Sequence, residues 1–502
     1  MRVPSASILS WSLLAGLVIA KNCPSQNCCN ALSNQLPRSQ VYHPQTTSYL
    51  DRIKSYFSVS AALEPWCIVL PSTTEDVSAV IKTLTMHECP FGIQSGGHGL
   101  FPGANSVRDG ITIDLGNMNT TTYNVETKTA SIQPGCRWKP VFETLAEYGV
   151  AVTGGRDSDV GAGGFILGGG NSFWSASHGW ACDNVANFEV VLADGSIINV
   201  NADEHADLFT ALKGGSGNFG IVTRFDMNTV EYTNPQHHIY GGSLTYSPES
   251  TKEAIAALVD FIDNQSKDLA SHAYTVWAYI PGIGTIISSF IANVLNDDSS
   301  STFDGIMGVP RMIGSTLRSA TVGNFTDEIL SPRGYRNIWK TSTYKNDARV
   351  IQYAVDKFND IVPCIEAAVS SENLLIVVAS FQPLTQPMVG HAAANGGNVL
   401  GLEQRVEDGN GVLFNAVVSL SGAENEKATL PLMNEWLDSV DEFARKEDLS
   451  LGWRYLNYAD GDQGPIASYG RESIEKIKAA TAKYNPNGVF QKLRKSGFKI
   501  PT

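Results

Sequence analysis

The sequence predicts an α+β protein, and three observations lead to this fold class. Short strands and helices alternate over residues 63–234, and three glycine-rich segments lie between them. Beyond Asn234-Pro235 glycine clusters become rare, and longer helical patterns with strands between them predict a second domain over residues 235–430. Residues 431–502 return to aromatic, glycine and asparagine chemistry, so we expect this segment to rejoin the first domain.

Length, composition and charge limit the class of protein. The chain has 502 residues, of which 43% are hydrophobic and 17% charged, and it contains no low-complexity tract. It is therefore long enough for two or three ordered domains with a large core. Its formal net charge of −14 argues against a nucleic-acid partner, because binding a polyanion needs a basic face.

The N-terminus is typical of a secretory signal peptide over residues 1–20. Met1-Arg2 precedes an apolar run that extends from Ile8 to Ala20. A membrane anchor is the alternative, but this run is short for a bilayer span and no other long apolar segment follows. We therefore expect a secreted protein without a membrane partner, in which residues 21–62 form an N-terminal arm.

Cysteine usage agrees with an oxidising compartment. The eight cysteines include four, ahead of or beside the first glycine segment, that can form two disulfides whose pairing the sequence does not fix: Cys28, Cys29, Cys67 and Cys89. No cysteine and histidine spacing typical of a metal site occurs, so no metal is expected. Three tripeptides of the glycosylation type begin at Asn119, Asn264 and Asn324.

The glycine-rich segments carry the strongest functional signal. They cover residues 91–99, 161–170 and 213–220, and the first contains Ser95-Gly96-Gly97-His98. Small residues let backbone N–H groups approach an anionic ligand closely. Three such segments among strands predict one long diphosphate-bearing cofactor wrapped by the backbone.

One motif is a false match. Residues 215–220 fit G-x-G-x-x-G, the dinucleotide fingerprint, which requires a strand before it and a helix after it. Here a predicted helix (207–212) precedes the glycines and a predicted strand (221–225) follows them. The order is reversed, so we do not expect a Rossmann site.

The ordered set of motifs resembles the berberine bridge enzyme-like branch of the vanillyl-alcohol oxidase and p-cresol methylhydroxylase superfamily, in its fungal secreted form. The resemblance covers nearly the whole mature chain. It rests on Ser95-Gly96-Gly97-His98, Gly154-Gly155, Gly161-Ala162-Gly163-Gly164, Cys182-Asp183-Asn184-Val185, Leu192-Ala193-Asp194-Gly195, Lys213-Gly214-Gly215 with Asn218-Phe219-Gly220, and Asn457-Tyr458. It implies a two-lobed FAD-binding domain of the p-cresol methylhydroxylase type, an α/β substrate domain with an antiparallel sheet, and a monomer.

The resemblance also implies how the cofactor is held. In such proteins the histidine of the Ser-Gly-Gly-His segment is joined to the 8α-methyl of FAD, which makes His98 the attachment residue. Many relatives carry a cysteine that forms a second link to the flavin, and the matching position here is Asp157. A single linkage is therefore expected. Val160 matches a valine that leaves room for O2 beside the flavin, which favours an oxidase. Gln94 departs from the family, whose members usually carry Arg or Lys there.

Candidate site residues follow from the same match. Cofactor contacts are expected from Ser95, Gly96, Gly97, His98, Gly99, Gly155, Asp157, Val160, Gly161, Gly163, Gly164, Gly214, Gly215, Asn218, Gly220 and Ile221. Asn457 and Tyr458 are the catalytic candidates, although a tyrosine with its ordinary pKa of about 10 needs activation to act as a base, and a buried structural role for Tyr458 is the alternative.

Other residues of the sequence suit the pocket less clearly. Trp277, Tyr279, Gln404 and Asn415 are possible lining residues of the second domain, with core packing as the alternative. His178 and Cys182 are expected to be structural.

The predicted function is that of a secreted, FAD-dependent oxidase. It would transfer a hydride from a small organic substrate to covalently bound flavin, which O2 reoxidises to give H2O2, in secondary metabolism. Two alternatives stay open: an oligosaccharide oxidase, and a flavin-binding paralogue without turnover.

Overall fold

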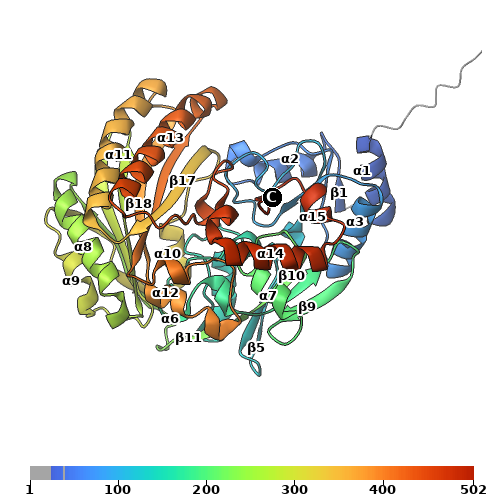
Figure 1. Cartoon of the computed structure of the whole chain (residues 1–502), viewed down its shortest axis with the longest axis horizontal. Coiled ribbons are helices and arrows are strands. Elements are labelled where there is room, and N and C mark those ends of the chain that lie inside the picture. The colour runs from blue at the N-terminus through green and yellow to red at the C-terminus, as the bar shows by residue number, and fades with distance from the viewer. Residues whose placement is uncertain (1–23, 38–39) are drawn as a thin grey trace, which may run out of the picture.

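The computed structural model describes residues 24–37 and 40–502, which fold into two lobes that lie side by side (Figure 1). The expected signal peptide lies outside the described residues. Both lobes combine helices with sheets, so the α+β prediction is confirmed. No helix in the described part of the chain has the length and apolar character needed to cross a membrane.

The first lobe begins with a four-stranded sheet in the order β1-β2-β4-β3. Its strands are β1 (Val41–Tyr42), β2 (Cys67–Val69), β4 (Ile111–Asp114) and β3 (Phe91–Gln94), of which β2, β4 and β3 are parallel. Helices of this part are α1 (Pro24–Gln35), α2 (Thr47–Lys54) and α3 (Thr74–Met86). Thr73 starts α3, because its hydroxyl accepts the N–H of Asp76 while the Asp76 carboxylate accepts the N–H of Thr73.

A second, antiparallel sheet of the first lobe has the order β5-β6-β10-β8-β9. It contains β5 (Thr121–Asn124), β6 (Thr129–Ile132), β10 (Ile221–Asn228), β8 (Val185–Val191) and β9 (Ile197–Asn201); a separate pair joins β7 (Val150–Ala151) to β11 (Val230–Glu231). The helices among these strands are α4 (Trp138–Ala146), α5 (Ala162–Leu167), α6 (Ser175–His178) and α7 (Ala206–Leu212). The glycine segments connect these elements to one another.

The second lobe is built on one eight-stranded antiparallel sheet, as expected. The order is β15-β12-β14-β13-β18-β19-β17, with β16 paired to β12. The strands are β12 (Ile239–Tyr246), β13 (Ser271–Ile280), β14 (Gly284–Asn293), β15 (Met312–Ser315), β16 (Arg318–Ala320), β17 (Arg336–Lys345), β18 (Leu374–Leu384) and β19 (Gly411–Leu420). Its helices are α8 (Thr251–Asp263), α9 (Asp304–Met307), α10 (Val322–Glu328), α11 (Ala348–Ala368), α12 (Gln386–Gly390) and α13 (Ala423–Lys446).

The helices α8, α11 and α13 cover one face of this sheet, and the other face turns toward the first lobe (Figure 1), where α10 packs against α4. The core under the helices contains Trp277, Phe381 and Phe414 from the sheet and Phe358 and Trp436 from α11 and α13. Side chains on the opposite face are therefore free to form a site with the first lobe, because successive residues of a strand point to opposite faces.

The chain returns to the first lobe after α13. Residue 430, where the sequence analysis ends the second domain, lies inside this helix, which packs on α11 and β17. Beyond it, α14 (Arg471–Tyr484) and α15 (Val489–Lys492) lie on the first lobe, where Figure 1 shows them in red. The N–H of Phe91 in the edge strand β3 donates to the carbonyl of Leu493.

Two disulfides attach the N-terminal arm to the first sheet. Cys28 pairs with Cys89 and Cys29 with Cys67. The two bridges connect α1 to β2 and to the segment between α3 and β3. The expectation of two disulfides among these four residues is confirmed, and the structure supplies the pairing that the sequence left open.

Candidate flavin and substrate site

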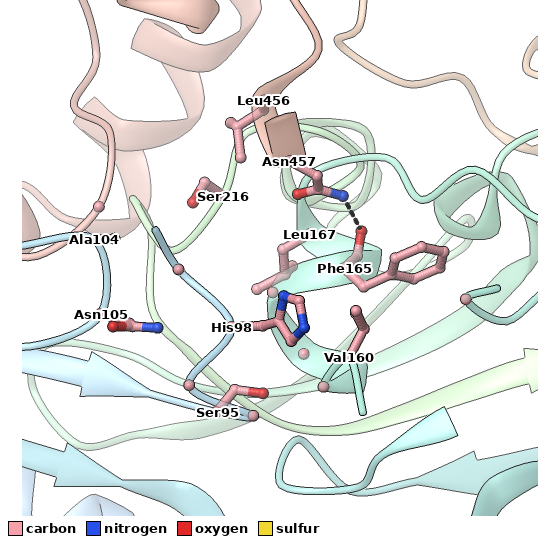
Figure 2. A pocket seen from close by; sticks show the side chains of 18 of the residues that line it. Ser95, His98, Ala104, Asn105, Val160, Phe165, Leu167, Ser216, Leu456 and Asn457 are labelled. Carbon is pink, nitrogen blue, oxygen red and sulfur yellow. Dashed lines mark hydrogen bonds between the residues drawn. The ribbon is translucent and has the colours of Figure 1, made fainter. Parts of the chain in front are cut away.

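A cavity of about 380 Å³ lies where the glycine segments of the first lobe face the sheet of the second. This volume is in the usual range of small-molecule sites. Figure 2 shows that His98, Val160 and Asn457 come from separate segments and gather around one space. Fifteen predicted site residues line the cavity: Ser95, Gly96, Gly97, His98, Gly99, Gly155, Asp157, Val160, Gly161, Gly163, Gly164, Gly220, Ile221, Asn457 and Tyr458.

Three predicted contacts do not line this cavity. Gly214, Gly215 and Asn218 lie behind its wall, where the Asn218 side chain donates to the carbonyl of Gly215 (2.8 Å). Ser216 and Gly217 line the cavity in their place. The third glycine segment thus exposes its middle residues, and Asn218 supports the turn from within the protein.

Two glycine segments touch through their backbones. A methyl group at Gly161 would overlap the Cα of Gly96, and one at Gly96 would overlap the Cα of Gly161. Any larger residue at either position would therefore push the two segments apart. Gly164 differs, because a methyl group there would meet no atom within 4 Å and would point into open space. The backbone at Gly164 consequently faces the cavity without side-chain cover.

His98 lies at the centre of the cavity wall (Figure 2). Its ring stacks on Phe57, with 3.9 Å between the ring centroids and 8° between the planes. Its Nε2 is buried and has no hydrogen-bond partner. Burial, with the Arg137 and Arg333 charges adding to it, lowers the pKa of His98 to about 3. The imidazole is therefore neutral and its ring is fixed in place.

A buried cation lies at one end of the cavity. Arg494, which is 3% exposed, lines the wall near Gly217 and donates to the side chain of Asn218 (2.7 Å) and the carbonyl of Phe498 (2.9 Å). Burial lowers the pKa of Arg494 to about 10, so the group is still charged at neutral pH. Sequence reasoning missed this residue, because no local pattern distinguishes it from other basic residues near the C-terminus.

A second buried arginine lies at the end that faces the second lobe. Arg156 donates to the Gln382 side chain (2.6 Å) and the Tyr458 hydroxyl (3.0 Å), and its other amino group lies 2.9 Å from Nε2 of His272. The Tyr458 hydroxyl in turn donates to Gln382 (3.3 Å). The sequence identified Tyr458 but not the other residues of this network, since they come from β13, β18 and the segment before α5.

Asn457 ties the C-terminal segment to the glycine wall. Its side-chain amide donates to the carbonyl of Phe165 (3.0 Å), the dashed line of Figure 2, and to the hydroxyl of Tyr455 (3.0 Å). The same hydroxyl accepts the backbone N–H groups of Gly170 and Asn171. These contacts fix the backbone on which Tyr458 is carried.

The other candidates from the second domain do not line the cavity. Trp277 is buried under the helices and donates to Thr251 of α8, Tyr279 contacts Glu366 on that same side, and Gln404 and Asn415 lie elsewhere. Tyr274, Gln382 and Trp339 take their place. Trp277 is an odd number of residues from Tyr274 along β13, so the two side chains point to opposite faces. His178 and Cys182 also lie outside the cavity wall.

Comparisons with known proteins agree with this geometry. Residues 65–201 match the sequence family described as FAD binding domain. FAD-dependent monooxygenase drtC of Aspergillus calidoustus is 36% identical, over 99% of this chain and 97% of its own length. FAD-dependent monooxygenase sdcF of Emericella nidulans is 39% identical, over 95% of this chain and 98% of its own length.

The chain belongs to the same family of FAD-dependent oxidoreductases as drtC and sdcF.

Solved structures share the fold of this FAD-dependent oxidoreductase. Berberine bridge enzyme from Eschscholzia californica has a TM-score of 0.74 and 17% identity, and the match covers 95% of this chain and 100% of that one. Xylooligosaccharide oxidase from Myceliophthora thermophila, in complex with xylobiose, has a TM-score of 0.76 and 18% identity with the same coverage. The FAD-binding fold expected from the sequence is therefore confirmed.

The residues around the cavity fit FAD. Both polar atoms of the Asn171 side chain and Nε2 of His98 are buried at its wall without partners, and buried polar groups normally have one. A bound ligand would supply such partners. The exposed backbone at Gly164 suits a flat ring system, and the charge of Arg494 suits a diphosphate.

Proposed function

We propose that this protein is a secreted oxidase that holds FAD covalently through His98 and oxidises a small organic substrate, with O2 as the final acceptor. The central observation is the half-buried ring of His98, whose buried Nε2 has no partner in a cavity that fits FAD. A neutral imidazole held against Phe57 would be a nucleophile toward the 8α carbon of FAD. The methyl group and the imidazole would each lose one proton, the isoalloxazine would take up two electrons, and O2 would remove them as H2O2. Asp157 stands where a cysteine would make a second link, so the proposal has a single attachment.

The reaction assigns distinct tasks to the chain's residues. When bound, FAD would supply the acceptor for a hydride from the substrate carbon, and O2 with two protons would remove both electrons as H2O2. Tyr458 removes the proton from the substrate oxygen, and Arg156 stabilises negative charge on the tyrosine hydroxyl to which it donates. Asn457 positions this segment through Phe165. Val160 keeps space for O2 at the cavity wall.

Two features support secretion. Residues 1–20 carry the signal-peptide pattern, and two disulfides join the arm to the first sheet, a combination typical of oxidising compartments. Asn119 and Asn324 are exposed and available for glycosylation. The resemblance of the motifs to fungal secreted oxidases favours a place in secondary metabolism.

The decisive experiment is acid denaturation of the purified protein, followed by a test for yellow colour in the polypeptide. We expect the flavin to stay with the wild-type chain and to be released from His98→Ala. His87→Ala is the matched control, because His87 is exposed at the end of α3. Flavin released from the wild type would refute the covalent link, and a colourless protein would refute the function.

A monooxygenase is the second candidate, because the relatives drtC and sdcF bear that name. The two reactions differ in the fate of O2. With ¹⁸O₂, an oxidase gives labelled H2O2 equal to the substrate consumed and an unlabelled product. A monooxygenase places one labelled atom in the product. Labelled product without H2O2 would replace our proposal with the second candidate.

A further inference from the structure

The cavity contains a buried positive charge that the protein itself does not neutralise. Arg156 is 9% exposed and lines the end of the cavity that faces the second lobe. Its hydrogen-bond partners are the neutral side chains of Gln382, Tyr458 and His272. Within residues 24–37 and 40–502, no carboxylate lies within the 4.0 Å of an ion pair with Arg156.

Acidic side chains in the same region are already engaged. Asp157 accepts the N–H groups of Ser331 (2.9 Å) and Asp159 (2.9 Å). Asp159 pairs with Arg137 (3.0 Å) and with Arg333. These carboxylates hold loops together and make no ion pair with the Arg156 guanidinium.

The surroundings of Arg156 keep its charge unbalanced. Burial and the Arg156 charge lower the pKa of His272 well below its ordinary value, so its ring is neutral and its Nε2 accepts a hydrogen bond from Arg156. The face of Tyr274 lies 5.4 Å from the guanidinium carbon and adds a cation–π contact without adding charge. The four groups around the arginine thus orient it and leave it a full cation.

The guanidinium has donors to spare. It carries five N–H groups, and three of them serve His272, Gln382 and Tyr458. One N–H on Nη1 and the N–H on Nε have no partner among the described residues. Burying a charge without a counter-charge is costly, so an unpaired cation at a cavity wall indicates a ligand that supplies the opposite charge.

We propose that Arg156 binds an anionic oxygen of the substrate, so that the substrates are small organic acids: carboxylates, or compounds with an ionised enol or phenol. This inference rests on the proposed function, because it treats this end of the cavity as the substrate side. A neutral oligosaccharide would leave the Arg156 charge unpaired, which disfavours a sugar oxidase. Arginine suits the task, since its planar group hydrogen-bonds carboxylates strongly and stays charged at all relevant pH values.

The test compares two probes of nearly the same shape, benzoate and benzamide, which differ in charge. Each is titrated at neutral pH into the purified holoprotein, and binding is followed by flavin absorbance and by tryptophan fluorescence. Trp339 lines the cavity and its ring lies 5.5 Å from that of Tyr458, so the fluorescence reports binding even where flavin is absent. We expect benzoate to bind about tenfold more tightly than benzamide, or better, as a charged hydrogen bond allows.

Variants assign the preference to one side chain. In Arg156→Gln the preference for benzoate should disappear, and in Arg156→Lys, which restores the charge without the planar group, it should return in part. Arg471→Gln is the matched control, because Arg471 is exposed on α14 and pairs only with Glu475. The flavin content and melting temperature of each variant show whether it has folded.

Three results would overturn the proposal: equal binding of both probes, no benzoate binding to the wild type, or an unchanged preference in the folded Arg156→Gln protein. Each is separate from a failure of the proposed function. A wild type that prefers benzoate yet carries no flavin would keep the anion site and refute the oxidase. A flavoprotein that ignores the charge of the probe would keep the oxidase and refute the anion site.

Discussion

The two walls of the cavity are made from different parts of the polypeptide. On the first lobe, backbone forms the wall, and Gly96 and Gly161 touch so closely that no side chain fits between them. On the second lobe, side chains such as Tyr274, Gln382 and Trp339 extend from separate strands of one sheet. Substitutions in the glycine wall would therefore disturb the fold, whereas residues of the strand wall can be replaced without changing the sheet. A family built this way can keep its cofactor and alter its substrate.

The largest expected effect comes from adding a side chain where the glycine segments meet. Gly161→Ala would force the backbone away from Gly96, a backbone neighbour that cannot swing aside, and overpacking of this kind costs about 3 kcal/mol or more. We expect a lower melting temperature and little bound flavin. Gly164→Ala is the control, since its methyl group enters open cavity: it should fold normally and lose only flavin. Equal melting temperatures for the two variants would contradict the comparison.

Removing a hydroxyl that contacts the strand wall should affect turnover and leave the fold intact. Tyr458→Phe keeps the ring beside Trp339 but removes the hydroxyl that contacts Arg156 and Gln382. Loss of a general base lowers kcat by about 100-fold or more. Flavin content and melting temperature should stay close to those of the wild type. Unchanged kcat would assign Tyr458 a purely structural role.

Substitution of Val160 tests whether this side chain controls the access of O2 to the flavin. Val160→Leu adds bulk at the cavity wall, where Figure 2 shows the side chain near His98 and Phe165. We expect slower reoxidation of the reduced flavin by O2 and an unchanged rate of flavin reduction by substrate. Stopped-flow absorbance measures the two steps separately. Equal slowing of both would mean that Val160 shapes the substrate position instead.

The smallest effect concerns Lys213, which joins the third glycine segment to the second lobe. Its Nζ donates to the carbonyl of Asn395 (2.6 Å) and lies 3.8 Å from the centre of the Phe209 ring. Burial lowers the pKa of Lys213 to about 8 from its ordinary 10.5.

Between pH 8 and pH 10.5 Lys213 is protonated in the unfolded chain and neutral in the folded one. The lysine therefore makes the free energy of unfolding rise with pH, by at most about 1.4 kcal/mol per pH unit. Below pH 8 both states are protonated, and the contribution is constant. Denaturant titrations between pH 8 and 10 should show this rise in the wild type relative to Lys213→Met. Parallel pH profiles would show that Lys213 does not titrate in this range.

The sequence predicted the glycine wall well and the strand wall poorly, for a physical reason. Gly161 could be found because it lies in a local cluster of glycines, and such a cluster is visible in the sequence. The environment of Arg156 could not be predicted, because its partners His272 and Gln382 are distant in the sequence. They come together with it only through the pairing of β13 with the rest of the sheet. Trp277 was a wrong candidate because its face of β13 is set by strand register, which no single residue type reveals.

The return of the C-terminus sets an order of events during synthesis. Leu493 pairs with the edge strand β3, and Arg494 and Phe498 complete the cavity wall. While the ribosome is still making these last residues, a cavity that already contains His98 lacks one end. The cavity is therefore complete only once the chain has been made as far as Phe498. A chain cut before Leu493 would lack this end of the cavity, so we expect it to fold most of both lobes and to hold little flavin.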